Sequence, residues 1–479
     1  MKKFIVFALA VTLAGGMAYA NYCARDIVPA STILVPYAVV SMTGSTPNPQ
    51  GYTTLLTITN VSKDAQIIHI TVWNAVSRAV LDWDEVLSGY DMWTINFRDM
   101  LTGQWGLFDT SRSSTAYPNT GQREPFEWGP DGRSAYQTAP IPGKLPLPDK
   151  TSDTPGAGCS MPYGDMSGYL GLFVPQLLAP MKARTHLGCG TQTVRGDKNA
   201  TWLTTLGANE LFFYVTIDVV NNCNLDFPTT AGYFQNTYLN ENVLIGDIIY
   251  MNANMNYSEA LPAVHIETSP ALFSRAASWM NFYEEKAASS DLPYLYLEPL
   301  ATALAFRYQN DPAGSRWGIP MTSNILLWKN FWEFSADLSN SAGNVNDCGA
   351  YMYYSWDEDE HVVTRGVQCP ISPCGSAEID PNVFPFETQM VPVTSANFDL
   401  PDKFGWMLVI FPPSYPASGY VDPTPNTTLL GRKYMAWGAY KFNYGTYSAA
   451  VEAATMANAH CFETQRLPYL GINYEYLVP

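Results

Sequence analysis

The densest group of charged side chains in this 479-residue sequence is an acidic run that ends in a histidine. It consists of Asp357, Glu358, Asp359, Glu360 and His361. Carboxylate oxygens from one loop suit Ca²⁺, so the functional interpretation of the four acids is a calcium site. The spacing is not that of an EF-hand loop, and the run contains no glycine for the turn. We therefore favour the solvated end of a hairpin, and keep calcium as the alternative to a protein without cofactors.

A second acidic cluster, Asp82-Trp83-Asp84-Glu85, adds carboxylates to this inventory. Glycoside hydrolysis needs two acids that face one sugar ring at a defined separation, and both acidic clusters are candidates for it. The sequence has five histidines, and a histidine on a strand is more often a hydrogen-bonded structural residue than a catalytic base. The usual local signatures of hydrolases, zinc proteases, phosphate-binding loops and dinucleotide-binding folds are missing from the sequence. These observations favour a protein that is not an enzyme.

Aromatic residues make up 14% of the sequence, including 13 tryptophans and 30 tyrosines. Exposed aromatic rings can stack on sugar rings or anchor a protein interface, because they offer a large rigid area with a polar tip. We expect most of them to fill the core. Trp105, Trp128 and Trp317 lie in glycine-containing loops, so they are the candidates for exposed, ligand-binding residues.

The N-terminus and the cysteines indicate export to an oxidising space. Residues 1–20 resemble a secretory signal peptide, with Lys2 and Lys3 before a short apolar stretch and Ala18-Tyr19-Ala20 as the cleavage site. We therefore expect a secreted protein of the periplasm, cell surface or extracellular space. An even number of cysteines in an exported chain predicts disulfides, although their pairing stays open. The candidates are Cys23, Cys159, Cys189, Cys223, Cys348, Cys369, Cys374 and Cys461.

The charge balance limits the possible partners. The formal net charge is −17, which excludes nucleic acid as the expected partner because that affinity comes from clustered cations. No segment after the leader has the roughly 20 consecutive apolar residues that span a bilayer. A low charged content of 14% with many tyrosines and asparagines suits contact with another copy of the chain, a surface glycan or another surface protein.

Short β-prone runs separated by turn residues dominate the sequence. The clearest strands are Tyr52 to Asn60 and Ile67 to Trp73, joined by a polar turn of hairpin length at residues 61–64. Leu211 to Val220 is nearly unbroken, as expected for a strand covered on both faces. One helix is predicted from Pro270 to about Ser289, since Ser269 can cap it and Pro270 suits its first position.

The fold class that follows is mainly β, with two antiparallel, Ig-like β-sandwich modules, a long Pro/Gly-rich insertion and one minor helix. The expected organisation is a signal peptide over 1–20, an N-terminal sandwich over 21–105, the insertion or linker over 106–186 and a C-terminal sandwich over 187–479. Residues 449–459 stay ambiguous on their own, because alanine favours helix whereas the flanking tyrosines favour strand.

A series of segments spread over nearly the whole mature chain carries a resemblance to other proteins. They are Ile33-Leu-Val-Pro-Tyr37, Thr53-Thr-Leu-Leu-Thr-Ile-Thr-Asn60, Gly89-Tyr-Asp-Met-Trp-Thr-Ile-Asn-Phe-Arg-Asp99, Phe213-Tyr-Val-Thr-Ile-Asp-Val-Val220, Asn242-Val-Leu-Ile-Gly-Asp247, Val264-His-Ile-Glu267, Phe306-Arg-Tyr308, Phe384-Pro-Phe-Glu-Thr-Gln389 and Phe404-Gly-Trp406. In these segments the chain resembles a family of secreted bacterial proteins of unknown function. The resemblance implies an exported β-rich protein and no particular catalysis, and it favours strand for residues 449–459. The loop Met251–Tyr257 departs from the Asp-Pro-containing loop of that family.

Together these features predict a secreted, non-enzymatic binding or structural protein of the cell surface or extracellular space, able to self-assemble, that uses aromatic and amide contacts. Two alternatives are kept. One is a secreted polysaccharide-acting glycoside hydrolase with a dispersed active site, and the other is a calcium-stabilised adhesin.

Overall fold

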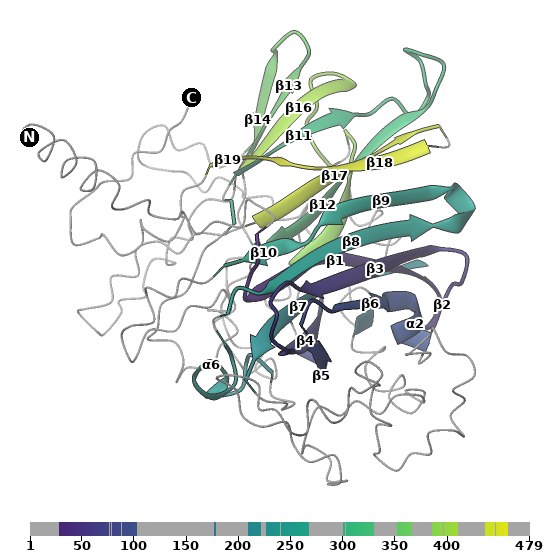
Figure 1. Cartoon of the computed structure of the whole chain (residues 1–479). Coiled ribbons are helices and arrows are strands. Elements are labelled where there is room, and N and C mark those ends of the chain that lie inside the picture. Colours follow the sequence, from purple (N-terminus) through teal and green to yellow (C-terminus); the bar gives the residue numbers. More distant parts are fainter. Residues whose placement is uncertain are drawn as a thin grey trace, which may run out of the picture.

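The computed structural model describes residues 28–75, 77, 79–87, 89–102, 177–178, 209–221, 227–239, 241–267, 300–301, 303–329, 352–365, 386–395, 397–410, 436–445 and 447–457. These residues form four antiparallel sheets with short helical turns (Figure 1). The predicted fold class, mainly β and antiparallel, is confirmed. The expected helix at 270–289 and all eight cysteines lie outside the described residues.

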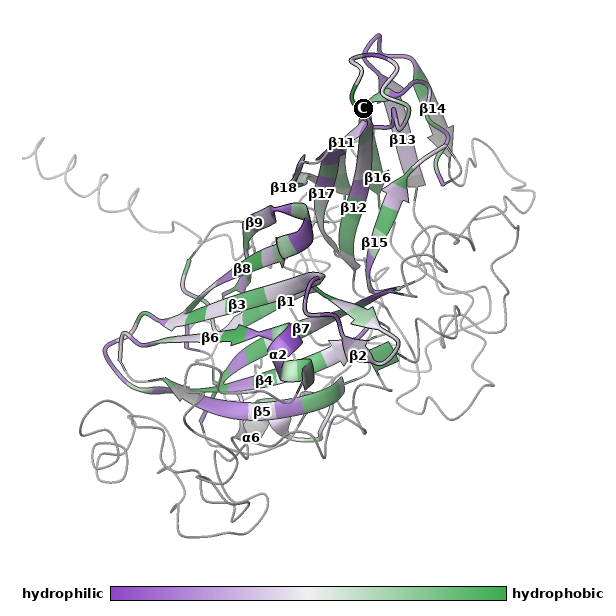
Figure 2. Cartoon of the chain, turned by 90° about the vertical axis from the view of Figure 1, so that its right-hand side faces the viewer, coloured by the Kyte–Doolittle hydropathy of each residue, from purple (hydrophilic) through white to green (hydrophobic). Residues whose placement is uncertain are grey.

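The first sheet, called here the β7 sheet, places a strand from the middle of the chain at its centre. Its order is β10 (Val264–Ile266), β1 (Thr32–Thr43), β7 (Glu210–Val220), β4 (Gln66–Asn74) and β5 (Ala79–Leu87), and the short β2 (Thr46–Pro47) pairs with β1. Nearly every residue of β7 is buried, so the predicted burial of residues 211–220 on both faces is confirmed. Figure 2 shows the more hydrophilic β5 at the edge of this sheet.

The second sheet, the β8 sheet, packs on the first. Its order is β6 (Met92–Asn96), β3 (Tyr52–Asn60), β8 (Leu244–Asn252) and β9 (Tyr257–Pro262). The hydroxyl of Tyr250 in β8 donates a 2.8 Å hydrogen bond to the carbonyl of Tyr37 in β1, and Trp83 in β5 lies 6.2 Å from Trp93 in β6 between ring centroids. These contacts bury apolar side chains between the two sheets.

The hairpin predicted around residues 61–64 is wrong, although both strands form where expected. β3 pairs with β6 and β8, whereas β4 pairs with β5 and β7, so the turn carries the chain from one sheet to the other. The side-chain amide of Asn60 donates a 2.8 Å hydrogen bond to the backbone carbonyl of Asp64 and closes this connection. Turn composition predicts a reversal of direction, but it does not tell whether the flanking strands pair.

Strand pairing also crosses the domain boundary expected between residues 105 and 187. β7, β8, β9 and β10 come from residues 210–266, yet they pair with strands from residues 32–96. Sheet membership therefore does not follow the predicted division into residues 21–105 and 187–479. The physical reason is that local periodicity defines a strand, but not its partner, when the partner lies more than a hundred residues away.

The remaining strands form two further sheets. The β16 sheet has the order β14 (Val362–Arg365), β13 (Met352–Asp357), β16 (Phe404–Ile410), β11 (Ala303–Gln309) and β19 (Ala454–Ala457). The β17 sheet has the order β15 (Thr388–Val393), β12 (Met321–Lys329), β17 (Ala436–Tyr444) and β18 (Tyr447–Glu452). The ambiguous segment at 449–459 is thus strand over its described residues apart from Ala453, as the family resemblance implies.

All four sheets share one hydrophobic core. Phe212 of β7 meets Phe386 at 5.9 Å, and the Thr388 hydroxyl of β15 donates to the carbonyl of Pro36 at 2.7 Å. Figure 1 shows β9 and β18, the edge strands of two sheets, side by side. The assignment of each sheet pair to an Ig-like sandwich stays a prediction.

Helical structure in the described part of the chain is confined to short turns. They are α2 (Phe97–Thr102), α6 (Tyr233–Asn236) and the 3₁₀ turn η2 (Ala253–Met255). Of the expected insertion at 106–186, only Leu177 and Leu178 are described, and both are buried in the core. Within the described residues, no helix has the length and apolar character needed to cross a bilayer.

Candidate aromatic binding face

A row of aromatic side chains lies on the outer face of the β16 sheet. The inner face is defined by Leu304 and Phe306, whose side chains lie against Gly438 of the β17 sheet. Side chains alternate along a strand, so the outer face carries the residues in between. We call this surface the aromatic face, and it comprises Trp317, Tyr354, Trp356, Phe404 and Trp406.

The two tryptophans at the centre of the aromatic face stack on each other. Trp356 of β13 lies directly opposite Trp406 of β16, and their rings are 3.8 Å apart between centroids with an interplanar angle of 10°. Tyr354 continues the stack at 5.7 Å from Trp356. All three side chains are half-buried. Because each ring fixes its neighbour, the row keeps its shape without a ligand.

The backbone at the centre of the row requires a glycine at position 405. Gly405 precedes Trp406 and lies against the carbonyl of Trp356, where an added Cβ would stand 1.8 Å from that oxygen. A side chain at this position would push β13 away from β16. Glycine is therefore required for the close approach that brings the two indoles into contact.

The loop between β11 and β12 extends the row at its other end. Trp317 is 54% exposed, as its glycine-containing loop predicts, and packs edge-on against Phe404 at 4.9 Å. The guanidinium carbon of Arg316 lies 5.2 Å from the Trp317 centroid and 4.9 Å from that of Phe404. The other two candidates, Trp105 and Trp128, lie outside the described residues.

This loop is held by one buried carboxylate. Asp311 accepts hydrogen bonds from the Ser315 hydroxyl and the Arg316 backbone N–H, both at 2.9 Å, and from Lys403 at 3.1 Å. These bonds, with that from the Arg316 N–H first, hold the pKa of Asp311 well below its ordinary value. The turn also uses left-handed backbone at Gly314, with φ of 65°. Arg316 and Trp317 are thus presented by a preformed loop.

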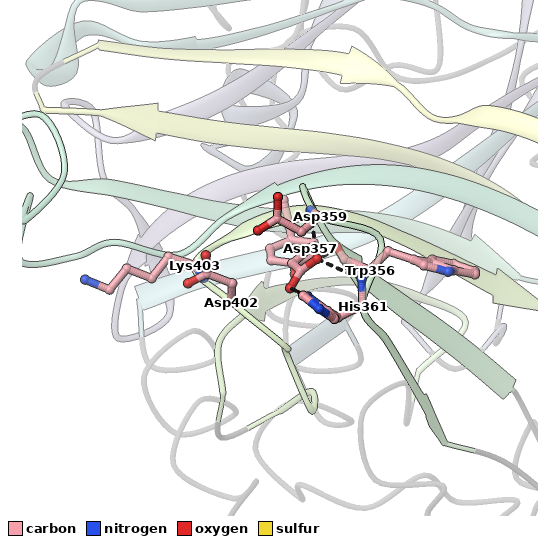
Figure 3. A network of polar contacts seen from close by, with 7 residues as sticks. Trp356, Asp357, Asp359, His361, Asp402 and Lys403 are labelled. Carbon is pink, nitrogen blue, oxygen red and sulfur yellow. Dashed lines mark hydrogen bonds and ion pairs between the residues drawn. The ribbon is translucent and has the colours of Figure 1, made fainter.

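The acidic run forms the tip of the β13–β14 hairpin, which agrees with the interpretation favoured from the sequence. The Asp357 carboxylate accepts from the backbone N–H groups of Asp359 and His361, both at 2.9 Å, and faces the His361 ring at 2.8 Å (Figure 3). Glu358 forms a 2.9 Å ion pair with Arg307. Figure 3 also shows the Trp356 side chain extending away from this polar cluster.

These bonds also determine the direction in which the pKa of Asp357 is shifted. Burial alone would raise the pKa of Asp357, but the bonds from His361 and Asp359 lower it on balance. In the described part of the chain, no group of three or more histidine, cysteine or acidic side chains is arranged to hold a metal ion. The calcium hypothesis for Asp357, Glu358, Asp359 and Glu360 therefore still depends on the sequence alone.

The second acidic cluster belongs to a buried polar row across the β7 sheet. Thr32, Asp218, His69 and Asp84 lie directly opposite one another on β1, β7, β4 and β5. Thr32 donates to Asp218 at 2.7 Å, and the Tyr233 hydroxyl of α6 donates to the other Asp218 oxygen at 2.8 Å. His69 and Asp84 are fully buried, so a sugar ring has no access to this carboxylate. The geometry gives the hydrolase alternative no support here.

A buried lysine lies between the β17 sheet and the β8 sheet. Lys441 of β17 lies 4.2 Å from the ring centroid of Tyr52 and 4.8 Å from that of Tyr257, and it donates a hydrogen bond to the Tyr52 hydroxyl. Burial lowers the pKa of Lys441 to about 8, and Glu210 opposes that shift. Lys441 thus lies in the contact between the β8 and β17 sheets.

Comparison with known proteins adds no identity to this geometry. A scan against protein-family models and a search of curated proteins found no match. The resemblance to secreted bacterial proteins therefore stays a prediction.

Sequence reasoning missed most of the aromatic face. It selected Trp317 but not Tyr354, Trp356, Phe404 or Trp406. The signal was present, because both strands place aromatic residues at a spacing of two, which puts them on one face. What the sequence does not contain is that β13 and β16, separated by the chain from 358 to 403, are direct neighbours.

Proposed function

We propose that the protein is an exported, non-enzymatic binding protein that holds a glycan chain against its aromatic face. The observation that carries the proposal is the stack of Trp356 on Trp406, in direct register on adjacent strands. Sugar rings have apolar C–H surfaces that pack on indole and phenol rings, while their hydroxyls bond to polar groups beside them. Half-buried rings that are already fixed lose little side-chain freedom on binding.

The shape of the surface supports a chain-like ligand over a globular partner. The row follows β16 from Trp317 and Phe404 to Trp406 and Trp356, and the Arg307–Glu358 ion pair borders it. A stable protein partner needs about 800 Å² on each side, with an apolar centre broader than a single row of rings. A linear glycan needs only the row.

Binding to a panel of immobilised bacterial, plant and host polysaccharides tests the proposal. Trp406→Ala and Trp356→Ala should weaken binding about tenfold or more, as expected for central aromatic contacts. Trp406→Phe should retain part of the affinity, which guards against a simple folding defect. Tyr447→Ala is the matched control, since Tyr447 is 77% exposed on the separate β17 sheet.

Two outcomes would overturn the proposal. One is a wild-type protein that binds no polysaccharide of the panel. The other is self-association that depends on the tryptophans, detected as a concentration-dependent size in exclusion chromatography that Trp356→Ala abolishes. That result would assign the aromatic face to contact between copies of the chain.

A further inference from the structure

We infer that the glycan is acidic, and that Arg316 binds one of its carboxylates at the Trp317 end of the aromatic face. This inference rests on the proposed function and names the class of ligand for the same surface. It follows from the side-chain environment of Arg316 and from the loop that presents it.

The guanidinium of Arg316 is exposed and has no protein acceptor among the described residues. Its carbon lies over the rings of Trp317 and Phe404, at 5.2 and 4.9 Å from their centroids. Arg307, on the same face, differs because its guanidinium is neutralised by Glu358 at 2.9 Å. Of these two arginines, Arg316 is the one with its side-chain N–H groups available to a ligand.

Stacking on aromatic rings suits a guanidinium for binding a carboxylate. Contact with the rings uses the face of the guanidinium plane, so the five N–H donors at its edge stay free for a bidentate carboxylate. The aromatic contact also fixes the plane and reduces the freedom lost on binding. A sugar ring that stacks on Trp317 and carries a carboxylate meets both groups together.

Hydrogen bonds within the loop that carries Arg316 fix the position of its backbone. Asp311 binds the Arg316 backbone N–H, the Ser315 hydroxyl and Lys403, while the Gly318 N–H donates to the Gly314 carbonyl at 2.7 Å. Lys403 is thereby committed to Asp311, and Arg316 is left as the free cation of this loop. A free arginine beside the exposed ring of Trp317 and the buried ring of Phe404 favours an anionic ligand locally, against the net charge of −17 of the whole chain.

The test uses acidic polysaccharides and their neutral counterparts. The probes are polygalacturonate, alginate and hyaluronate, each compared with its methyl ester at about 50 mM NaCl, where screening is weak. We expect the wild type to bind at least one acid form about fivefold or more tighter than its ester, and this preference to shrink at about 500 mM NaCl. Arg316→Gln should abolish the preference. Arg316→Lys should retain part of it, because lysine keeps the positive charge but lacks the paired N–H donors of the guanidinium.

Arg98→Gln is the control, because it removes the same charge from a half-buried arginine in α2, outside the aromatic face. Equal binding of acids and esters by the wild type overturns the inference, as does an acid preference that survives in Arg316→Gln. If only neutral polysaccharides of the larger panel bind, the proposed function stands and this inference fails. If no polysaccharide binds, the proposed function itself fails, and the inference fails with it.

Discussion

The imidazole Nδ1 of His69 lies 2.8 Å from the Asp84 carboxylate, and both side chains are fully buried between β4 and β5. Burial alone would lower the pKa of His69, but Asp84, Asp82 and Asp218 outweigh it, so the pKa lies above its ordinary value. A raised pKa in the folded state means that the charged pair stabilises the fold fully below about pH 6.5. That contribution is lost as the pH rises through the folded-state pKa.

We therefore expect the stability difference between the wild type and His69→Gln to be largest near pH 6 and to shrink towards about pH 9. Removing the histidine leaves buried carboxylates without their cation, which costs about 3–5 kcal/mol at the lower pH. Urea unfolding at a series of pH values measures the difference. Asp84→Asn should flatten the same dependence, whereas a difference independent of pH would contradict a charged His69.

Lys441 gives the opposite dependence. Its pKa is lowered to about 8 by burial, so the charged form opposes folding, and stability should rise as the pH increases from about 8 towards 10. Lys441→Met should remove this rise and stabilise the protein by about 1–3 kcal/mol at pH 7, as apolar replacements of buried charges often do. Lys63→Met is the exposed control. A destabilised Lys441→Met would show that the contacts with Tyr52 and Tyr257 outweigh the desolvation cost.

The hairpin tip contains a strained residue that can be relieved. Glu360 has φ of 64°, in the left-handed region that favours glycine. A residue with a Cβ pays about 1–2 kcal/mol there, part of which glycine returns as chain entropy. Glu360→Gly should therefore raise stability by about 0.5–1 kcal/mol, seen as a higher melting temperature. An unchanged or lower melting temperature would mean that the Glu360 side chain makes a compensating contribution.

Removal of divalent cations tests the calcium hypothesis. Because the Asp357 oxygens already accept bonds from Asp359 and His361, we expect the same melting temperature with and without a chelator. A decrease of several degrees in the chelator, reversed by added Ca²⁺, would instead favour a calcium-stabilised protein. Asp359→Asn and Glu358→Gln would then show whether the ion binds at this hairpin.

The sequence predicted individual strands well and their partners poorly. Residues 211–220 and 52–60 form strands at almost the expected bounds, because apolar periodicity reports burial directly. The buried row of Thr32, Asp218, His69 and Asp84 was out of reach, since it depends on register between distant segments. The aromatic face lies between these extremes. The alternation of Tyr354 with Trp356 was visible, but the neighbouring Trp406 was not.

The central place of β7 has a consequence for biogenesis. β1 and β4 are both complete before residue 75, yet they do not pair with each other, because β7 lies between them and supplies hydrogen-bonding partners to both more than 130 residues later along the chain. While the polypeptide is being made, its first hundred residues hold unsatisfied strand edges, among them the two that pair with β7. Such edges recruit other chains. The nascent protein must therefore be kept apart from its own copies until residue 220 has emerged, and a truncation before that point should aggregate.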